Sequence, residues 1–413
     1  MAPLGVFRGS TPSSCPSNSI NHHKHDPSKV KIKHGSPGLV LLTRMCYKQG
    51  KIFINALKPK PLLNKKGLNR RKMGPYPFET GIYRPPSEGG SASLLVRFTR
   101  NCPWNHCTFC AMYKTKKFQL RPLEEIKQDI NAMAALARDL RSISVTLGHG
   151  GQITREAIIT LADKVPQLND HEGFAMVVHW LMSQGKTAFI QDGNSLIMKT
   201  QDLVQALDHL KVTFPSLQRV TTYARARTLV QKSPQDLAAI QQAGLDRLHL
   251  GLETGDDDLL KKITTGVTSQ GQIQAGQKAM AAGFQVSEYW MPGLGGREMT
   301  QAHARNTARV LNAINPHYIR SRPFRAIEGT LIHTQVRTGQ VHLLSPNEQL
   351  AELNQMISAL DVTSRVCFDH AGNNWRTPGG KLVFTHDYEG SKFPEEKQQV
   401  LDLIDKGLEG HLN

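Results

Sequence analysis

Short apolar segments alternate with amphipathic helical patterns between residues 94 and 323, and this alternation limits the possible folds more than any other property of the chain. Helical patterns follow all but the last of the apolar segments. Such alternation is typical of a parallel sheet with right-handed crossovers. The sequence therefore predicts an α/β fold in which six strand–helix units form an open sheet or a partial barrel. The six predicted strands span 94–99, 188–190, 219–223, 247–253, 284–291 and 318–323.

A long connection separates the first two predicted strands. Residues 142–186 exceed the usual length of a crossover and contain two further helical patterns, at 155–164 and 174–182. We therefore expect an insertion of helices between the first two strands.

Basic residues are concentrated at the N-terminal end. Of the formal net charge of +17, +14 lies in residues 1–72, where Asp26 is the only acid. Like charges in a run repel one another, so we expect residues 1–72 to be a disordered basic extension, with Met73 a candidate for the true start. A short apolar stretch at 38–43 could form a strand, but we find no partner for it in the surrounding sequence.

The remaining chain has ordinary globular character. With 39% hydrophobic and 21% charged residues overall, wholesale disorder is excluded. We expect a core domain over 73–335 and a mainly helical C-terminal extension over 336–413, with helices near 346–360 and 394–408. No apolar run has the length of a membrane-spanning helix, and no secretory signal is recognisable, which predicts a soluble, cytoplasmic protein.

Three of the six cysteines lie close together, directly after the first predicted strand. Cys102, Cys107 and Cys110 fall within nine residues. Thiolates favour zinc, Cu(I) and iron–sulfur clusters. A structural zinc site needs a fourth ligand, but Cys367 is solitary and His106 lies between two of the cysteines. Three ligands instead suit a [4Fe-4S] cluster with one open iron, while structural zinc or reduced buried thiols remain the alternative.

This cysteine loop and the strand–helix alternation resemble the radical S-adenosylmethionine (SAM) superfamily over about residues 90–325. Members have three cysteines separated by three and then two residues, with an aromatic residue, here Phe109, before the last. This chain departs from the pattern because four residues, 103–106, separate the first two cysteines. The turn at 265–268 is similar to the branch that contains methylthiotransferases and oxygen-independent coproporphyrinogen oxidases. The resemblance implies a partial (β/α)6 barrel that binds a [4Fe-4S] cluster and SAM.

Polar residues and glycines stand where four of the predicted strands end. The C-terminal ends of parallel strands form one rim of a barrel, and active sites form there. The resemblance implies roles in binding SAM for these positions and for Phe109, which would pack near the adenine. We expect contacts with the methionine part from Asp192, Gly193, Asn194, Tyr223 and Arg225, with the ribose from Glu253, and with the adenine from Met291 and Gly293.

Two further groups are candidates for contact with a second substrate. Arg320 and Arg322 are expected to face the same rim, where they could hold an acidic substrate, although surface ion pairs would explain them as well. Cys367 lies in a polar–aromatic patch at 367–375 and is a candidate hydrogen donor or ligand, with a plain buried cysteine as the simpler interpretation.

The resemblance implies an enzyme that cleaves SAM reductively to a 5′-deoxyadenosyl radical, which then abstracts hydrogen from a substrate. A reduced flavodoxin or ferredoxin-type protein would donate the electron. Two alternatives remain open. The chain could be a non-catalytic iron–sulfur or porphyrin carrier, or an RNA-modifying member that binds RNA through its basic extension. Residues 336–413 show no compact basic β-domain, so we do not expect the core to bind nucleic acid.

Overall fold

The computed structural model describes residues 42–48, 51–57, 74–81 and 93–409 of a chain that divides into two units, 1–64 and 65–413. In the first unit, β1 (Leu42–Lys48) and β2 (Lys51–Leu57) form an antiparallel hairpin. Leu42 and Thr43, the end of the apolar stretch at 38–43, thus have a partner strand that the sequence did not lead us to expect, while residues 38–41 lie outside the described residues. The disorder predicted for the rest of residues 1–72, and Met73, lie outside the described residues.

The second unit is built on one sheet of eight strands, in the order β12-β11-β10-β9-β8-β7-β6-β3. All neighbours from β3 to β11 pair in parallel, and only β12 is antiparallel. The predicted α/β fold with six parallel strands is confirmed. The strands are β3 (Ser93–Val96), β6 (Thr187–Ile190), β7 (Arg219–Ala224), β8 (Arg247–Glu253), β9 (Gln285–Trp290), β10 (Tyr318–Ser321), β11 (Arg365–Cys367) and β12 (Ser391–Lys392).

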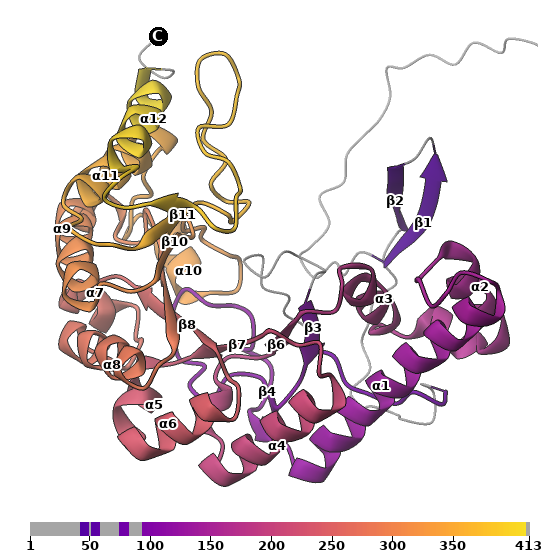
Figure 1. The fold of residues 1–413 in the computed structure, drawn as a ribbon. Coiled ribbons are helices and arrows are strands. Elements are labelled where there is room, and N and C mark those ends of the chain that lie inside the picture. The colour runs from indigo at the N-terminus through magenta and orange to yellow at the C-terminus, as the bar shows by residue number, and fades with distance from the viewer. Residues whose placement is uncertain (1–41, 49–50, 58–73, 82–92, 410–413) are drawn as a thin grey trace, which may run out of the picture. The chain divides into compact units, whose positions relative to one another are not determined.

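Helices follow the strands and form an arc around the outside of the curved sheet, as Figure 1 shows. The crossover helices are α1 (Leu123–Thr146), α4 (Thr200–Thr213), α5 (Ala226–Gln231), α6 (Pro234–Gln242), α7 (Asp257–Lys262), α8 (Ser269–Ala281) and α9 (Gly296–Ile314). The predicted insertion contains α2 (Arg155–Lys164), the 3-10 helix η3 (Pro166–Asp170) and α3 (Phe174–Met182); another 3-10 helix, η4 (Ser195–Ile197), follows β6. Within the described residues, no helix is long and apolar enough to cross a membrane.

Local sequence explains where several helices begin. The side chains of Thr154, Ser233 and Thr268 each accept a hydrogen bond from a backbone N–H in the first turn, which satisfies a donor that the helix itself cannot pair. At α11, Ser345 and Glu348 form a reciprocal capping box. These residues explain why the predicted helix starts lie close to the observed ones.

The C-terminal extension is not merely helical. Besides α10 (Leu331–Arg337), α11 (Pro346–Ser358) and α12 (Lys397–Glu409), the chain after residue 335 supplies β11 and β12 to the sheet. Trp290 of β9, Leu353 of α11 and Ile404 of α12 are fully buried in one hydrophobic cluster. The extension and the barrel strands therefore share a core, and the loop after β11 is brought to the same edge of the sheet as the loop after β10.

A second hairpin brackets the cysteine loop. Thr99–Arg100 (β4) pairs antiparallel with Gln119–Leu120 (β5), so both ends of the intervening loop are held next to each other. The loop that carries the cysteines is thereby closed at its base.

Candidate functional site

A cavity of about 450 Å³ lies at the C-terminal ends of the parallel strands. This volume is in the range of small-molecule sites. The three clustered cysteines enter it from one side, and strand ends and the loop after β11 form the remaining walls. The lining residues are Cys102, Cys107, 109–113, Gly193, 223–227, Gly251, Glu253, Thr265, Val267, Gln272, Tyr289, Met291, Arg322, Pro323, Arg325, Ile327 and His370.

Backbone contacts fix the shape of the cysteine loop. The Cys110 N–H donates to the Cys107 carbonyl over 3.3 Å, so the last two cysteines lie on one tight turn. The Thr108 N–H donates to the carbonyl of Ile263 at the end of α7, and its carbonyl accepts from the N–H of Ile332 in α10. The loop is therefore held by two separate helices.

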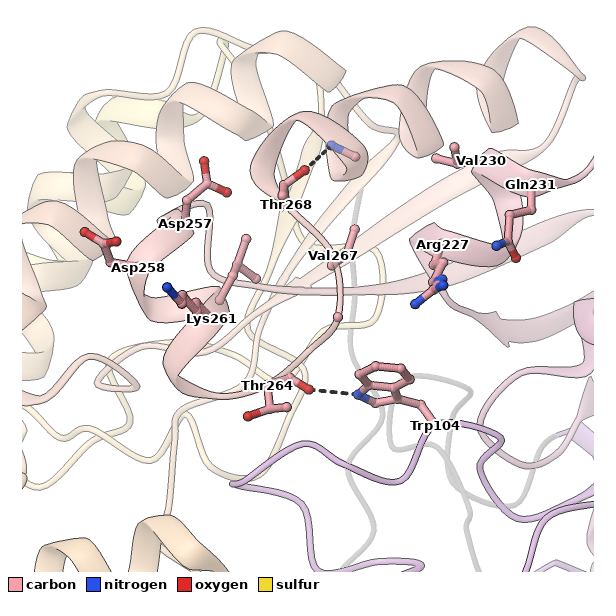
Figure 2. Close-up of a pocket in the computed structure, with 13 residues that line it drawn as sticks. Trp104, Arg227, Val230, Gln231, Asp257, Asp258, Lys261, Thr264, Val267 and Thr268 are labelled. Atoms are coloured by element: carbon pink, nitrogen blue, oxygen red, sulfur yellow. Dashed lines mark hydrogen bonds between the residues drawn. The ribbon is translucent and has the colours of Figure 1, made fainter.

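Trp104, in the unusual four-residue gap, anchors the first half of the loop (Figure 2). Its Nε1–H donates to the Thr264 carbonyl over 2.8 Å. The ring packs on Gly266, where φ is +72° and an added Cβ would lie only 2.4 Å from the ring. The Arg225 guanidinium lies 4.7 Å from the ring centroid, within cation–π range. Through Trp104, the four-residue gap is therefore attached to the segment between β8 and α8. An open cavity of about 800 Å³ lies beside this contact.

The three clustered thiols line the cavity and are candidate ligands of an iron–sulfur cluster. Cys102, Cys107 and Cys110 are half-buried and line the same cavity. Within the described ranges, no three His, Cys, Asp or Glu side chains gather closely enough to hold one metal ion. A zinc ion needs all its ligands within about 2.3 Å, whereas thiolates of a [4Fe-4S] cluster bind different irons and stand further apart. Burial raises the pKa of Cys107 to about 12, so a bound metal would have to displace its proton.

Asp192, predicted to contact the methionine amino group, is not among the residues lining the cavity. Its side chain is fully buried, its φ is 72°, and its Oδ2 accepts from Arg97 Nε over 2.6 Å. Another Arg97 nitrogen, Nη2, donates over 3.3 Å to the Oδ1 of Asn101, the residue before Cys102. Asp192 therefore supports the base of the cysteine loop through Arg97.

The two residues after Asp192 have different placements. Gly193 lines the cavity, and a Cβ at this position would lie 3.1 Å from the Cβ of Cys102 and 3.2 Å from its Sγ. Asn194 is buried outside the lining: its Nδ2 donates to Thr228 Oγ1 over 2.8 Å, and its Oδ1 accepts from the Arg225 N–H over 3.3 Å. The turn after β6 thus contributes a close backbone approach, while Asn194 positions the start of α5.

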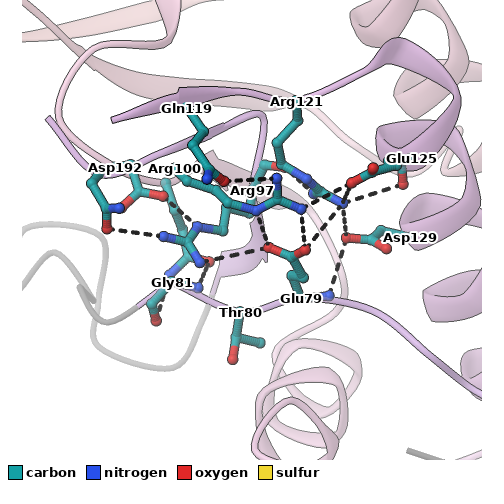
Figure 3. A network of polar contacts seen from close by, with 12 residues as sticks. Glu79, Thr80, Gly81, Arg97, Arg100, Gln119, Arg121, Glu125, Asp129 and Asp192 are labelled. Atoms are coloured by element: carbon teal, nitrogen blue, oxygen red, sulfur yellow. Dashed lines mark hydrogen bonds and ion pairs between the residues drawn. The ribbon is translucent and has the colours of Figure 1, made fainter. Parts of the chain in front are cut away.

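Arg97 belongs to a larger network of buried ion pairs (Figure 3). Arg121 and Asp129, both with fully buried side chains, pair over 2.8 Å, and Arg121 also donates to the Arg97 carbonyl. Glu79 accepts from Arg100 Nε over 2.8 Å and lies 3.6 Å from Arg97. The network ties residues 74–81, β4 and α1 to the cysteine loop. Sequence reasoning missed it because its members are far apart in the chain and form no local motif.

Four of the other predicted SAM contacts line the cavity, as does Phe109. They are Tyr223, Arg225, Glu253 and Met291. Burial raises the pKa of Glu253 to about 7, with Arg322 opposing the shift, so this carboxyl can both donate and accept near neutral pH. Burial also lowers the pKa of Arg225, whose guanidinium donates to the Thr265 carbonyl.

Gly293, predicted to contact the adenine, instead contacts the C-terminal extension. Its φ is 82° and its N–H donates over 2.6 Å to Oε1 of Glu352, a buried residue of α11. Glu352 Oε2 also accepts from the Thr300 hydroxyl over 2.6 Å. The extension thereby holds the turn after β9, and Gly293 itself does not line the cavity.

The expectation that Arg320 faces the rim is wrong. Its side chain is fully buried below the cavity, donating to Ser287 Oγ over 3.0 Å and to Asp369 Oδ2 over 2.8 Å. β10 ends at Ser321, so Arg322, two residues further along the same face, reaches the cavity instead. Cys367 pairs in register with Arg320, is fully buried and also lies outside the cavity lining.

Sequence reasoning missed several lining residues, among them Tyr113, Tyr289, Arg325 and His370. His370 lies in the polar–aromatic patch at 367–375. The sequence therefore did point to this segment, but through Cys367, which does not line the cavity. Arg325 follows the last predicted strand and carried no distinguishing pattern.

The chain is similar in sequence and fold to known proteins. The sequence profile of the radical SAM superfamily matches residues 96–311. The heme chaperone HemW of Bacillus subtilis (strain 168) is 29% identical over 180 residues, which are 42% of this chain and 45% of that protein. The match thus spans less than half the length of this curated relative.

Similar solved structures include the radical SAM methyltransferase TsrM from Kitasatospora setae, with a TM-score of 0.43 and 13% identity, covering 83% of this chain and 66% of that one. Coproporphyrinogen III oxidase HemN from Escherichia coli has a TM-score of 0.39 and 14% identity, covering 70% and 54%.

Proposed function

The chain belongs to the radical SAM superfamily, and from that membership we propose that it is an enzyme which cleaves SAM at a [4Fe-4S] cluster held by Cys102, Cys107 and Cys110. The observation that carries this proposal is the meeting of three thiols and the polar strand ends in one cavity. A bound cluster would, when reduced, supply the electron for the cleavage of SAM and so the radical chemistry that takes a hydrogen atom from a second substrate.

Arg225 is proposed to hold the carboxylate of the methionine part. Arg225 lines the same cavity as Cys102 and Cys107, two of the proposed cluster ligands, which supports this role. The Trp104 ring and the Thr265 carbonyl restrict the guanidinium, so less side-chain freedom is lost when a carboxylate binds.

Glu253, Phe109 and Met291 are proposed to hold the nucleoside part. The half-buried carboxyl of Glu253, with its pKa near 7, is able to accept from or donate to ribose hydroxyls. Phe109 and Met291 belong to one apolar cluster and offer a wall suited to the adenine ring. Together with Tyr223, these side chains exclude water from the reacting atoms.

Asp192 is proposed as a positioning residue. Its buried contact with Arg97, and that of Arg97 with Asn101, supports a role in holding the backbone beside Cys102. Gly193 is proposed to let the turn approach Cys102 closely. A small reduced protein of the flavodoxin or ferredoxin type is proposed as the electron donor.

A second candidate function is that of a carrier of heme or a related porphyrin. The similarity to a protein named as a heme chaperone, over 180 residues, favours it. The two candidates differ in a measurable way, because a carrier binds heme stoichiometrically and does not need to turn SAM over.

The proposal is tested by anaerobic reconstitution with iron and sulfide. We expect about four irons per chain, and 5′-deoxyadenosine formation when SAM and a chemical reductant are added. Cys107→Ala should lose both, whereas the control Cys367→Ser, a buried cysteine outside the cavity lining, should keep both. Stoichiometric zinc in place of iron, or tight heme binding without any 5′-deoxyadenosine, would overturn the proposed enzyme.

A further inference from the structure

One wall of the cavity has no role in the proposed contacts with the cluster and SAM. Arg322, Arg325 and His370 line it, and all three side chains carry N–H donors. Arg322 follows β10 directly, and His370 lies three residues beyond the end of β11. Because β10 and β11 pair in parallel, with Arg320 opposite Cys367, the segments after them emerge side by side. The barrel and the C-terminal extension therefore build this wall together.

His370 is held in one orientation. Its Nδ1 accepts a hydrogen bond from the Gly372 N–H over 2.9 Å, so in the neutral ring the proton is on Nε2, which is a donor. Gly372 is required for this closeness, since an added Cβ would lie 2.8 Å from Nδ1 and 3.4 Å from Pro323. The turn that presents His370 is thus packed against the segment after β10.

The buried side-chain amide of Asn373 attaches the His370 loop to β10 through hydrogen bonds. Asn373 is fully buried; its Nδ2 donates to the Ser321 carbonyl over 3.0 Å, and its Oδ1 accepts from the Ser321 hydroxyl over 2.8 Å. Asp369 is engaged by the buried Arg320 over 2.8 Å. These contacts preorganise the His370 loop next to Arg322 without any ligand, as expected of a built binding surface.

The wall has an excess of positive charge. Arg325 is exposed and makes no hydrogen bond or ion pair with any residue in the part of the chain that the structure describes. The pKa of His370 is lowered to about 4, first by burial and then by the nearby charges of Arg322, Arg325 and His386. The charge of Arg322 also acts on the carboxyl of Glu253, which is proposed to bind the ribose. An anion bound here would relieve the repulsion among these groups.

We infer that Arg322, Arg325 and His370 bind an anionic group, a carboxylate or a phosphate, of the second substrate. This inference rests on the proposed function, because the second substrate is defined as the molecule from which hydrogen is taken. It assigns a substrate-binding role to the C-terminal extension, which supplies His370. It keeps Arg322 from the predicted acidic-substrate site and replaces Arg320 with Arg325 and His370, which line the cavity.

The test measures binding of simple anions to the cluster-loaded protein, with and without saturating SAM. Succinate is the carboxylate probe, glycerol 3-phosphate the phosphate probe, and glycerol the neutral control, all at constant ionic strength in anaerobic equilibrium dialysis. We expect at least one anion to bind while SAM is present and glycerol to bind less. Whichever anion binds identifies the chemistry of the substrate group.

Arg325→Gln should weaken that binding about tenfold, the loss expected when one charge-assisted contact is removed. The matched control is Arg305→Gln, an exposed arginine of α9 that likewise makes no hydrogen bond or ion pair within the described residues. It should leave both anion binding and SAM cleavage unchanged. Because Arg325 is exposed, its replacement does not threaten folding.

Three results would overturn the inference: neither anion binds, Arg325→Gln binds as tightly as the parent, or saturating SAM displaces the anion. The last would mean that these cations hold the carboxylate of SAM. Iron content and 5′-deoxyadenosine are measured on the same preparations. Protein that binds anions at this wall but never cleaves SAM would contradict the proposed enzyme, and the anion site itself would stand.

Discussion

Beneath the cysteine loop, beside β3 and β6, charged side chains are buried in pairs, whereas the charged side chains that line the cavity beyond β10 and β11 are half-buried or exposed and positive. Arg97 meets Asp192, and Arg121 meets Asp129, with little or no access to water. Arg325, on the other side, has no such partner among the described residues. The first side is complete before any ligand arrives, and the second presents donors to a ligand. We interpret the first as holding cofactors in place and the second as selecting the substrate.

The strongest test of this difference removes the buried pair beneath the cysteine loop. Arg121→Met should destabilise the fold by roughly 3–5 kcal/mol, because it leaves Asp129 buried without its cation. Urea unfolding measures the loss, and iron content should fall with it, since Arg121 also supports the Arg97 carbonyl. The control is Lys127→Met, which breaks a partly exposed pair with Glu124 and should cost less than about 1 kcal/mol. Equal losses of unfolding free energy in the two variants would show that the buried pair is no more important for stability than the partly exposed one.

A smaller effect is expected from crowding the cysteine loop without touching a charge. Gly193→Ala would place a Cβ 3.1 Å from that of Cys102, which is closer than an ordinary van der Waals contact, so Cys102 must move slightly to accommodate it. Overpacking of this kind costs about 1–3 kcal/mol, and we expect reduced iron content after reconstitution while the fold is retained. Gly379→Ala serves as the control, because the nearest atom lies 4.0 Å from the added Cβ. Full iron loading of the Gly193 variant would show that close approach to Cys102 is not needed.

The smallest effect concerns the acid sensitivity of the substrate side. The pKa of His370 is lowered from 6.5 to about 4 by burial, then by Arg322, Arg325 and His386. The unfolded chain therefore binds more protons than the folded one between these pH values, and His370 destabilises the fold increasingly as pH falls through this window. His370→Gln should flatten the decline in the free energy of unfolding from pH 6.5 to 4.

The control for that measurement is Asn374→Ala, which replaces an exposed side chain of the same loop that does not titrate. Its dependence of unfolding free energy on pH should follow that of the parent protein. If His370→Gln and the parent lose stability in parallel on acidification, the pKa of His370 is not lowered in the folded protein.

Much of the fold could be predicted because it is encoded locally. The six parallel strands, the insertion helices and the three-cysteine loop follow from short-range periodicity, helix caps and spacing, which depend only on neighbours in the chain. β11 was missed because three residues in a polar segment, Arg365–Cys367, carry no detectable strand pattern. They become a strand only through pairing with β10.

The sequence alone determined the order of strands and helices, the cluster ligands as candidates, and membership of a superfamily recognisable from these features. Only the tertiary structure decided which polar residues face the cavity. Asp192 and Arg320 both looked like rim residues, yet each is covered by a partner distant in the chain, Arg97 and Asp369. A buried charge must be paired, and the choice of partner depends on which segments the fold brings together. The same packing left Arg325 exposed at the cavity and brought His370 to it, which no local pattern could reveal.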